Sequence, residues 1–269
     1  MASCNTGIER TKRITPTRAD RFIMRESAEE ALADSVHPVP LSEWTPGKEF
    51  VVTNSRASLL YDITDRSGRR THQDSIQDMT VRYIGTDVAV APDGRNISVV
   101  KFDIPSLDRF MTYTVRKDPA ATGSMVWSDF PMLIDLDMVS EFSTMLTGRK
   151  VWLRTALWYD NDMNPVKGRK FIPVTIGQVR RGNSSFPLLI CFDDGKDKAW
   201  LPMNMPDGKG NQGSRSFASL FYISDPKLRF PDISPEVWEL ICSGQVQPGM
   251  TKQECKLALG LSLIHISEP

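Results

Sequence analysis

The sequence predicts a mainly β protein with minor α: two small antiparallel barrels in tandem, followed by a C-terminal helical hairpin. Three observations lead to this fold class. Short runs that alternate apolar and polar residues, bounded by turn residues, begin at Trp44 and continue through the middle of the chain. These runs fall into two sets that resemble each other at a spacing of about one hundred residues. Near the end, two segments carry helix start and stop signals.

Composition limits the classes of function. The chain has 269 residues, of which 40% are hydrophobic and 25% charged, so it can bury the cores of two compact domains. Basic and acidic residues are equal at 33 each, which removes the overall positive charge of a nucleic-acid binder, and we expect no nucleic-acid partner. Apolar runs long enough for a membrane-spanning helix are absent from the sequence.

The first part of the chain is residues 1–43. It begins with the letters MASC, continues as a polar, locally basic arm over residues 5–18, and then favours a short helix within residues 19–35. Proline residues at 38 and 40 end that helix. The basic arm suits a chain that leaves a surface of anionic lipids, and equally suits a simple solvated arm.

The first β domain is predicted at residues 44–118 and the second at residues 129–225. The second domain opens with an amphipathic helix from Asp135 to Gly148. Turns at Pro92-Asp93-Gly94 and Asp193-Asp194-Gly195 connect neighbouring strands as hairpins. The strands are expected at residues 49–53, 79–84, 97–102 and 110–115 of the first domain, and at 150–155, 171–179, 188–192 and 198–203 of the second.

The two sets of strands share a short pattern. Residues 47–53 align with residues 148–154, because in both a glycine and a basic residue lead into an apolar strand. A tyrosine-aspartate pair follows in both sets, at Tyr61 and at Tyr159. This pattern predicts a repeated unit rather than one large sheet. Small five-stranded barrels of this size resemble bacterial SH3-like domains, which is a resemblance of fold alone.

The helical hairpin is predicted at residues 231–260. Ser234 is a suitable N-cap, Pro235 suits the first helical position, and Gly244 ends the first helix. Thr251 and Glu254 form a capping box that starts the second helix.

The stretch ICSGQVQPGMTKQECKLALG resembles the helical hairpin of the SmpA/OmlA-type outer-membrane lipoproteins. The resemblance implies packing and capping roles, not chemistry, for the residues that carry it. In that family the chain continues into a small sheet, whereas residues 262–269 resemble the translated read-through of a sequencing adapter. We therefore expect a truncated hairpin and a non-native tail at residues 261–269. The matching residues are Ile241, Gly244, Gly249, Met250, Thr251, Leu257 and Gly260.

The first four residues resemble the end of a bacterial lipobox, in which a small residue precedes a lipid-modified cysteine. The resemblance implies a Bacteroidetes-like envelope lipoprotein, located in the periplasm and anchored to the membrane through Cys4. It also requires an apolar signal segment before Met1. The alternative is an ordinary cytoplasmic start with an incidental cysteine.

Reactive residues are scattered along the chain. The cysteines lack the CxxC spacing of metal or redox sites, and we expect no catalytic, cofactor-binding or metal-binding residue. Cys242 and Cys255 lie on either side of the hairpin turn, so an oxidising periplasm allows a disulfide between them if the two helices bring their Cα atoms within about 7 Å. The stretch Asp160–Asn164 mimics the start of a calcium loop, but Pro165 and Phe171 occupy the positions that require glycine and glutamate.

These observations favour a non-catalytic interaction or scaffold protein of the cell envelope, with an unspecified envelope-protein or cell-wall partner and an unspecified oligomeric state. The alternative is a cell-wall hydrolase or a glycan- or peptide-binding protein. A cleft that brings His72 against two carboxylates would favour the hydrolase.

Overall fold

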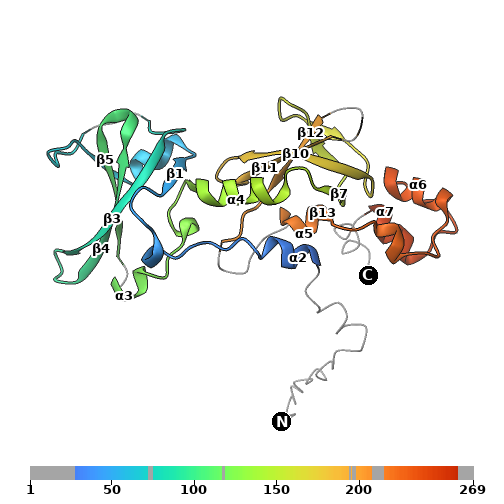
Figure 1. Ribbon diagram of the computed structural model, residues 1–269, viewed down its shortest axis with the longest axis horizontal. Coiled ribbons are helices and arrows are strands. Elements are labelled where there is room, and N and C mark those ends of the chain that lie inside the picture. The colour runs from blue at the N-terminus through green and yellow to red at the C-terminus, as the bar shows by residue number, and fades with distance from the viewer. Residues whose placement is uncertain are drawn as a thin grey trace, which may run out of the picture.

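The computed structural model describes residues 28–71, 75–116, 119–193, 195, 198–207 and 215–259. In this part of the chain the protein is mainly β, with two antiparallel sheets and short helices. Figure 1 shows two β bodies along the long axis, with helix α4 (Leu136–Leu146) between them and helices α6 (Pro235–Ser243) and α7 (Lys252–Leu259) beyond the second. Cys4, His72, Gly260 and the predicted tail lie outside the described residues.

The first β unit is a six-stranded sheet with the order β2-β5-β4-β3-β1-β6. Its central strand β4 alternates buried and more exposed positions, so that Val100, Phe102 and Ile104 face the core. The turn with Gly94 at a φ of 79° joins β3 to β4, as predicted. The strands are β1 (Glu49–Val52), β2 (Asp62–Thr64), β3 (Thr80–Val90), β4 (Asn96–Ile104), β5 (Arg109–Val115) and β6 (Leu133–Asp135).

The second β unit is a seven-stranded sheet with the order β13-β7-β10-β11-β12-β8-β9. Neighbouring strands β10, β11 and β12 form an antiparallel meander, and the pairing of Asp193 with Lys198 confirms the predicted hairpin between β11 and β12. The strands are β7 (Lys150–Leu153), β8 (Leu157–Tyr159), β9 (Pro165–Lys167), β10 (Pro173–Arg181), β11 (Leu188–Asp193), β12 (Lys198–Met203) and β13 (Phe221–Tyr222).

The predicted repeat is confirmed by the strand pairings. Strands β2, β5, β4, β3, β1 and β6 of the first sheet occupy the same positions as β8, β12, β11, β10, β7 and β13 of the second. Each unit also has an irregularity in its main hairpin, after Tyr83 in β3 and after Ile176 in β10. The two units therefore share one backbone plan, to which the second adds strand β9.

The limits of the first unit differ from the prediction. Strand β6 lies within the range predicted for the second domain, 129–225, yet it pairs with β1 and forms the edge of the first sheet. The first unit therefore extends to Asp135, and α4 begins at the next residue. A three-residue strand is too short to show a period of two in the sequence, which explains the difference.

Helix α4 joins the two units. Its buried residues Met138, Val139, Phe142 and Leu146 lie on one face, and the helix contacts both β10 and β1. The buried side chains of both sheets and of α4 form one continuous hydrophobic cluster. The remaining short elements are α2 (Ala28–Ala33), η1 (Leu41–Glu43), η2 (Ser55–Leu59), η3 (Pro105–Leu107), α3 (Pro119–Thr122), η4 (Trp127–Asp129), α5 (Phe217–Leu220) and η6 (Pro226–Arg229).

Helix α6 begins and ends, and helix α7 begins, as the sequence predicts. Ser234 accepts a hydrogen bond from the Val237 amide, and Gly244 ends α6 in the left-handed conformation, with a φ of 72°. Thr251 and Glu254 form the predicted reciprocal capping box at the start of α7. The two helices contact each other and pack on a separate apolar cluster formed with Phe171 and Tyr222 of the second unit and its neighbours.

Candidate functional site

A buried ion pair lies where the first unit meets α4. Lys48 follows Gly47, which adopts a φ of 97° and directs the chain into β1. The Lys48 ammonium lies 2.9 Å from a carboxylate oxygen of Asp135 and 2.6 Å from one of Asp137. The side chains of Lys48 and Asp135 are 7% and 1% exposed, whereas that of Asp137 is 59% exposed. Two carboxylates therefore share one lysine, and one of them faces solvent.

Asp135 also caps helix α4. Its carboxylate accepts hydrogen bonds from the backbone amides of Asp137 and Met138, at 3.0 and 3.3 Å. Burial acts to lower the pKa of Lys48, but its hydrogen bonds and charge attraction with Asp137 and Asp135 outweigh burial and hold that pKa above its usual value. Lys48 thus stays protonated at neutral pH, whereas burial raises the pKa of Asp135, and the trio ties β1 to α4.

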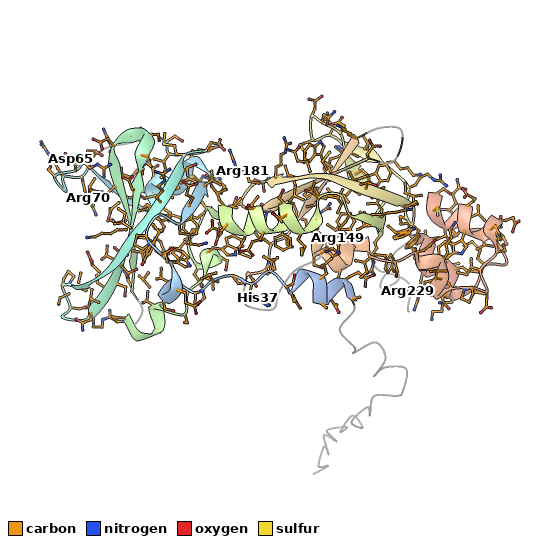
Figure 2. All side chains as sticks on the ribbon, viewed as in Figure 1. His37, Asp65, Arg70, Arg149, Arg181 and Arg229 are labelled. Atoms are coloured by element: carbon orange, nitrogen blue, oxygen red, sulfur yellow. The ribbon has the colours of Figure 1, made fainter. Side chains whose placement is uncertain are left out.

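A groove opens beside this ion pair. It has a volume of about 570 Å³ and runs between α4 and the chain segment that follows α2. Figure 2 shows His37 on that segment, below α4. The apolar part of the lining is Val39, Met138 and Met145, and methionine side chains adapt readily to different ligand shapes. The polar part consists of His37, Lys48, Asp137, Ser140, Glu141 and Thr144.

The carboxylates of the groove exceed its cations. Asp137 and Glu141 lie four residues apart on α4, a spacing that brings their like charges together on one face of the helix. Asp137 is partnered by Lys48, but Glu141 is exposed and forms no ion pair within the part of the chain that the structure describes. The groove therefore offers an open carboxylate beside apolar walls.

A second surface of interest is the outer face of the second sheet. The Arg180 guanidinium stacks over the Trp200 ring at 4.0 Å, and the Trp200 indole N–H donates to Asn161 at 3.0 Å. Arg215 lies 5.5 Å from the Phe186 ring centroid and donates from Nε to the Pro202 carbonyl. Burial lowers the pKa of Arg215. This face is an aromatic and arginine layer without a groove among the described cavities.

The described residues of the family resemblance lie in the packing and at the ends of α6 and α7. Ile241 is fully buried, and its carbonyl accepts a hydrogen bond from the Gly244 amide. Gly249 adopts a φ of 97°, and Met250 and Leu257 pack against the cluster around Trp238. These contacts explain how the helix pair packs.

The predicted disulfide is not formed in the structure. Cys242 and Cys255 are both free thiols, the first buried in α6 and the second partly exposed in α7. Burial raises the pKa of the Cys242 thiol, which makes it a poor nucleophile. The stretch Asp160–Asn164 forms a polar turn between β8 and β9, in which Asp160 accepts hydrogen bonds from the amides of Asp162 and Asn164.

Sequence reasoning missed the Lys48 cluster and the groove beside it. It identified Asp135 as a helix start, and it noted a basic residue after Gly47, but their partnership joins positions far apart in the chain. Within the described ranges, His, Cys, Asp and Glu side chains form no group able to hold a metal ion. The described helices include none long and apolar enough to cross a membrane.

Comparisons with known proteins give no relative. No family model, no curated protein and no solved structure matches this chain. The chain's own geometry is therefore the basis for a functional proposal.

Proposed function

We propose that this chain is a non-catalytic interaction protein of the bacterial envelope, which holds a partner in the groove between α4 and residues 37–39. The observation that carries the proposal is that groove of about 570 Å³, with its methionine walls and open carboxylate. The buried charges behind it, Lys48 and Asp135, are bound to each other and to the start of α4. The groove is thus a firm surface whose exposed groups remain available to a partner.

The proposal includes the finer description of the fold. Each β unit is SH3-like, and α6 with α7 forms a hairpin similar to that of the SmpA/OmlA lipoproteins. The repeated strand order of the two sheets supports the first part. The caps at Ser234, Gly244 and Thr251 support the second.

The groove is tested by photo-crosslinking in living cells. A photoreactive phenylalanine analogue replaces Ser140, which is exposed and lines the groove. We expect a discrete crosslinked adduct at this position. The matched control places the same analogue at Ser55, which is exposed in η2 of the first unit. Adducts that are absent from position 140, or identical at both positions, would contradict the proposal.

The envelope location is a separate part of the proposal, and it depends on Cys4, which lies outside the described residues. In the native bacterial host, the lipid anchor predicts that the protein fractionates with membranes. Replacement Cys4→Ser is expected to move it to the soluble fraction. A Cys4→Ser protein that still fractionates fully with membranes would rule out this anchor.

The outer face of the second sheet favours the alternative of glycan or peptide binding. The exposed Arg180 guanidinium, which lies over the buried Trp200 ring, offers hydrogen-bond donors to the carboxylates and carbonyls of a cell-wall glycan or peptide. This alternative is tested by co-sedimentation of the protein with purified cell-wall sacculi. If the outer face binds the cell wall, the protein should sediment with the sacculi and Arg180→Ala should reduce the fraction that sediments. If the groove binds the partner instead, Arg180→Ala should leave that fraction unchanged.

A further inference from the structure

The charge and shape of the groove beside α4 also indicate which kind of partner it binds. We propose that the groove binds a basic peptide segment, with one lysine or arginine side chain inserted between α4 and residues 37–39. This inference deepens the proposed function and depends on it. Its basis is the combination of apolar walls with carboxylates that lie at the groove's surface.

The walls fit the aliphatic part of such a side chain. Val39 and Met145 are partly buried members of the lining that pack against the main hydrophobic cluster. A lysine or arginine stem buries its methylene groups along such surface while the charged end reaches a polar partner. Thr144 and Ser140, both exposed on α4, add hydroxyl groups that can accept hydrogen bonds from the bound peptide.

The polar end of the groove fits a cationic head. Among the lining residues, Lys48 counts as +1 and Asp137 and Glu141 as −1 each, so with His37 counted as neutral the groove carries a net charge of −1. Both ion pairs of the Lys48 ammonium go to Asp135 and Asp137, so it does not neutralise Glu141. An incoming ammonium or guanidinium relieves the repulsion between Asp137 and Glu141, which lie four residues apart on α4.

Anionic partners fit this groove poorly. An acidic peptide or a nucleic acid would place its charges beside Asp137 and Glu141, and like charges in contact oppose binding. The equal numbers of basic and acidic residues in the chain, 33 each, give no general attraction for nucleic acid that could compensate. Charge complementarity therefore selects the basic peptide.

The test measures fluorescence anisotropy of two labelled twelve-residue peptides with the full chain at low and physiological salt. One peptide alternates lysine with alanine, and the other alternates glutamate with alanine. We expect binding of the basic peptide alone. Glu141→Gln should weaken it about fivefold, since a partly exposed ion pair contributes about 1 kcal/mol. Ser140→Arg, which places a cation of the protein in the groove, should weaken binding further.

The matched control is Glu239→Gln, which removes the same charge from an exposed position of α6 and should change the affinity less than about twofold. Equal binding of both peptides, or equal effects of Glu141→Gln and Glu239→Gln, would overturn the inference. If the peptides fail while crosslinks from position 140 persist, the groove still binds a partner and only the basic peptide is wrong. If the crosslinks also fail, the proposed function fails with it.

Discussion

The two β units share a backbone frame and differ in the side chains placed on it. In each unit a residue with positive φ precedes the third strand of the plan, Asp78 at 61° in the first and Phe171 at 56° in the second. The amide of Asp78 donates to the Val52 carbonyl at 2.8 Å, and the amide of Phe171 donates to the Leu153 carbonyl at 2.6 Å. The same turn therefore occurs twice with the same hydrogen bond.

What the two turns contact is different. Asp78 forms a 3.0 Å ion pair with Arg181 of the second unit, and Figure 2 shows Arg181 between the two β bodies. Phe171 packs against Trp238 of α6, with ring centroids 5.7 Å apart. In both units the turn contacts the next body along the chain, once by an exposed ion pair and once by a buried aromatic ring. The backbone of the two units is therefore repeated, whereas the side chain at this one position determines whether the contact with the next body is polar or apolar.

The largest effect is expected from Phe171→Ala. Phe171 is 6% exposed, so the change removes a buried ring and should cost about 3–5 kcal/mol of the free energy of unfolding. The loss should be concentrated in α6 and α7, because Phe171 belongs to the cluster that holds them. Hydrogen exchange should show faster exchange in these helices than in β10 and β11.

The paired change in the first unit is Asp78→Ala. Its ion pair with Arg181 joins side chains that are 59% and 40% exposed, so the free energy of unfolding should fall by less than about 1 kcal/mol. Chemical denaturation measures both variants. Equal losses for Phe171→Ala and Asp78→Ala would show that the two junctions do not differ as the contacts indicate.

The next effect concerns the basic residue that follows the repeated glycine. Lys48→Met leaves Asp135 buried without its cation, and we expect a loss of about 3 kcal/mol in the free energy of unfolding. The equivalent Arg149→Met should cost about 0.5–1 kcal/mol, because Arg149 is exposed and donates one hydrogen bond, to the Met145 carbonyl. Thermal and denaturant unfolding compare the two variants.

A matched loss at positions 48 and 149 would mean that the buried charge pair contributes no more than a surface contact. The double replacement Lys48→Met with Asp135→Asn sharpens the result. It removes both charges and should recover part of the loss, because no charge remains buried without a partner.

The local parts of this fold were predictable from sequence. Asp135, Ser234 and Gly244 form hydrogen bonds with residues a few positions away in the chain. The starts of α4 and α6 and the end of α6 can therefore be predicted from short stretches of sequence. The repeat was also visible, because Gly47 and Gly148 mark the same turn before an apolar strand.

The remainder depends on contacts between distant positions. Phe171 was expected in a strand because it is apolar, whereas it lies before β10 in the left-handed region and its ring serves the helix pair. Strand β13 has two residues, which is too few for a periodic pattern. The groove could not be predicted, since α4 and the segment at His37 meet through tertiary packing alone.

A smaller effect is expected at the repeated glycines. Gly47 and Gly148 have φ values of 97° and 81°, and an added Cβ would meet no atom within 4 Å at either position. Replacement by alanine therefore costs conformational energy alone, about 1–2 kcal/mol in each unit. Denaturant unfolding should give equal losses for Gly47→Ala and Gly148→Ala. The Gly47 amide donates to the Tyr83 carbonyl and the Gly148 amide to the Ile176 carbonyl, so unequal losses would show that the two turns carry different strain despite this shared hydrogen bond.

The smallest effect on stability is expected at Cys191 and appears at alkaline pH. The equivalent residue of the first unit is Lys101, which forms an exposed ion pair with Asp87, whereas Cys191 is 6% exposed and pairs across strands with Trp200. Burial raises the pKa of the Cys191 thiol. The unfolded chain therefore ionises first, so this contribution to stability is complete below about pH 8.5 and is lost as the pH rises through the folded pKa.

The same burial makes Cys191 slow to react. In a variant with Cys4, Cys242 and Cys255 replaced by serine, labelling by an aromatic disulfide at pH 8 should be much slower in the folded protein than in denaturant. Trp200→Ala should accelerate it, because that ring lies beside the thiol on the neighbouring strand. Fast labelling of the folded protein would show that the aromatic and arginine side chains do not cover Cys191. The outer face of the second unit would then be as accessible to solvent as that of the first.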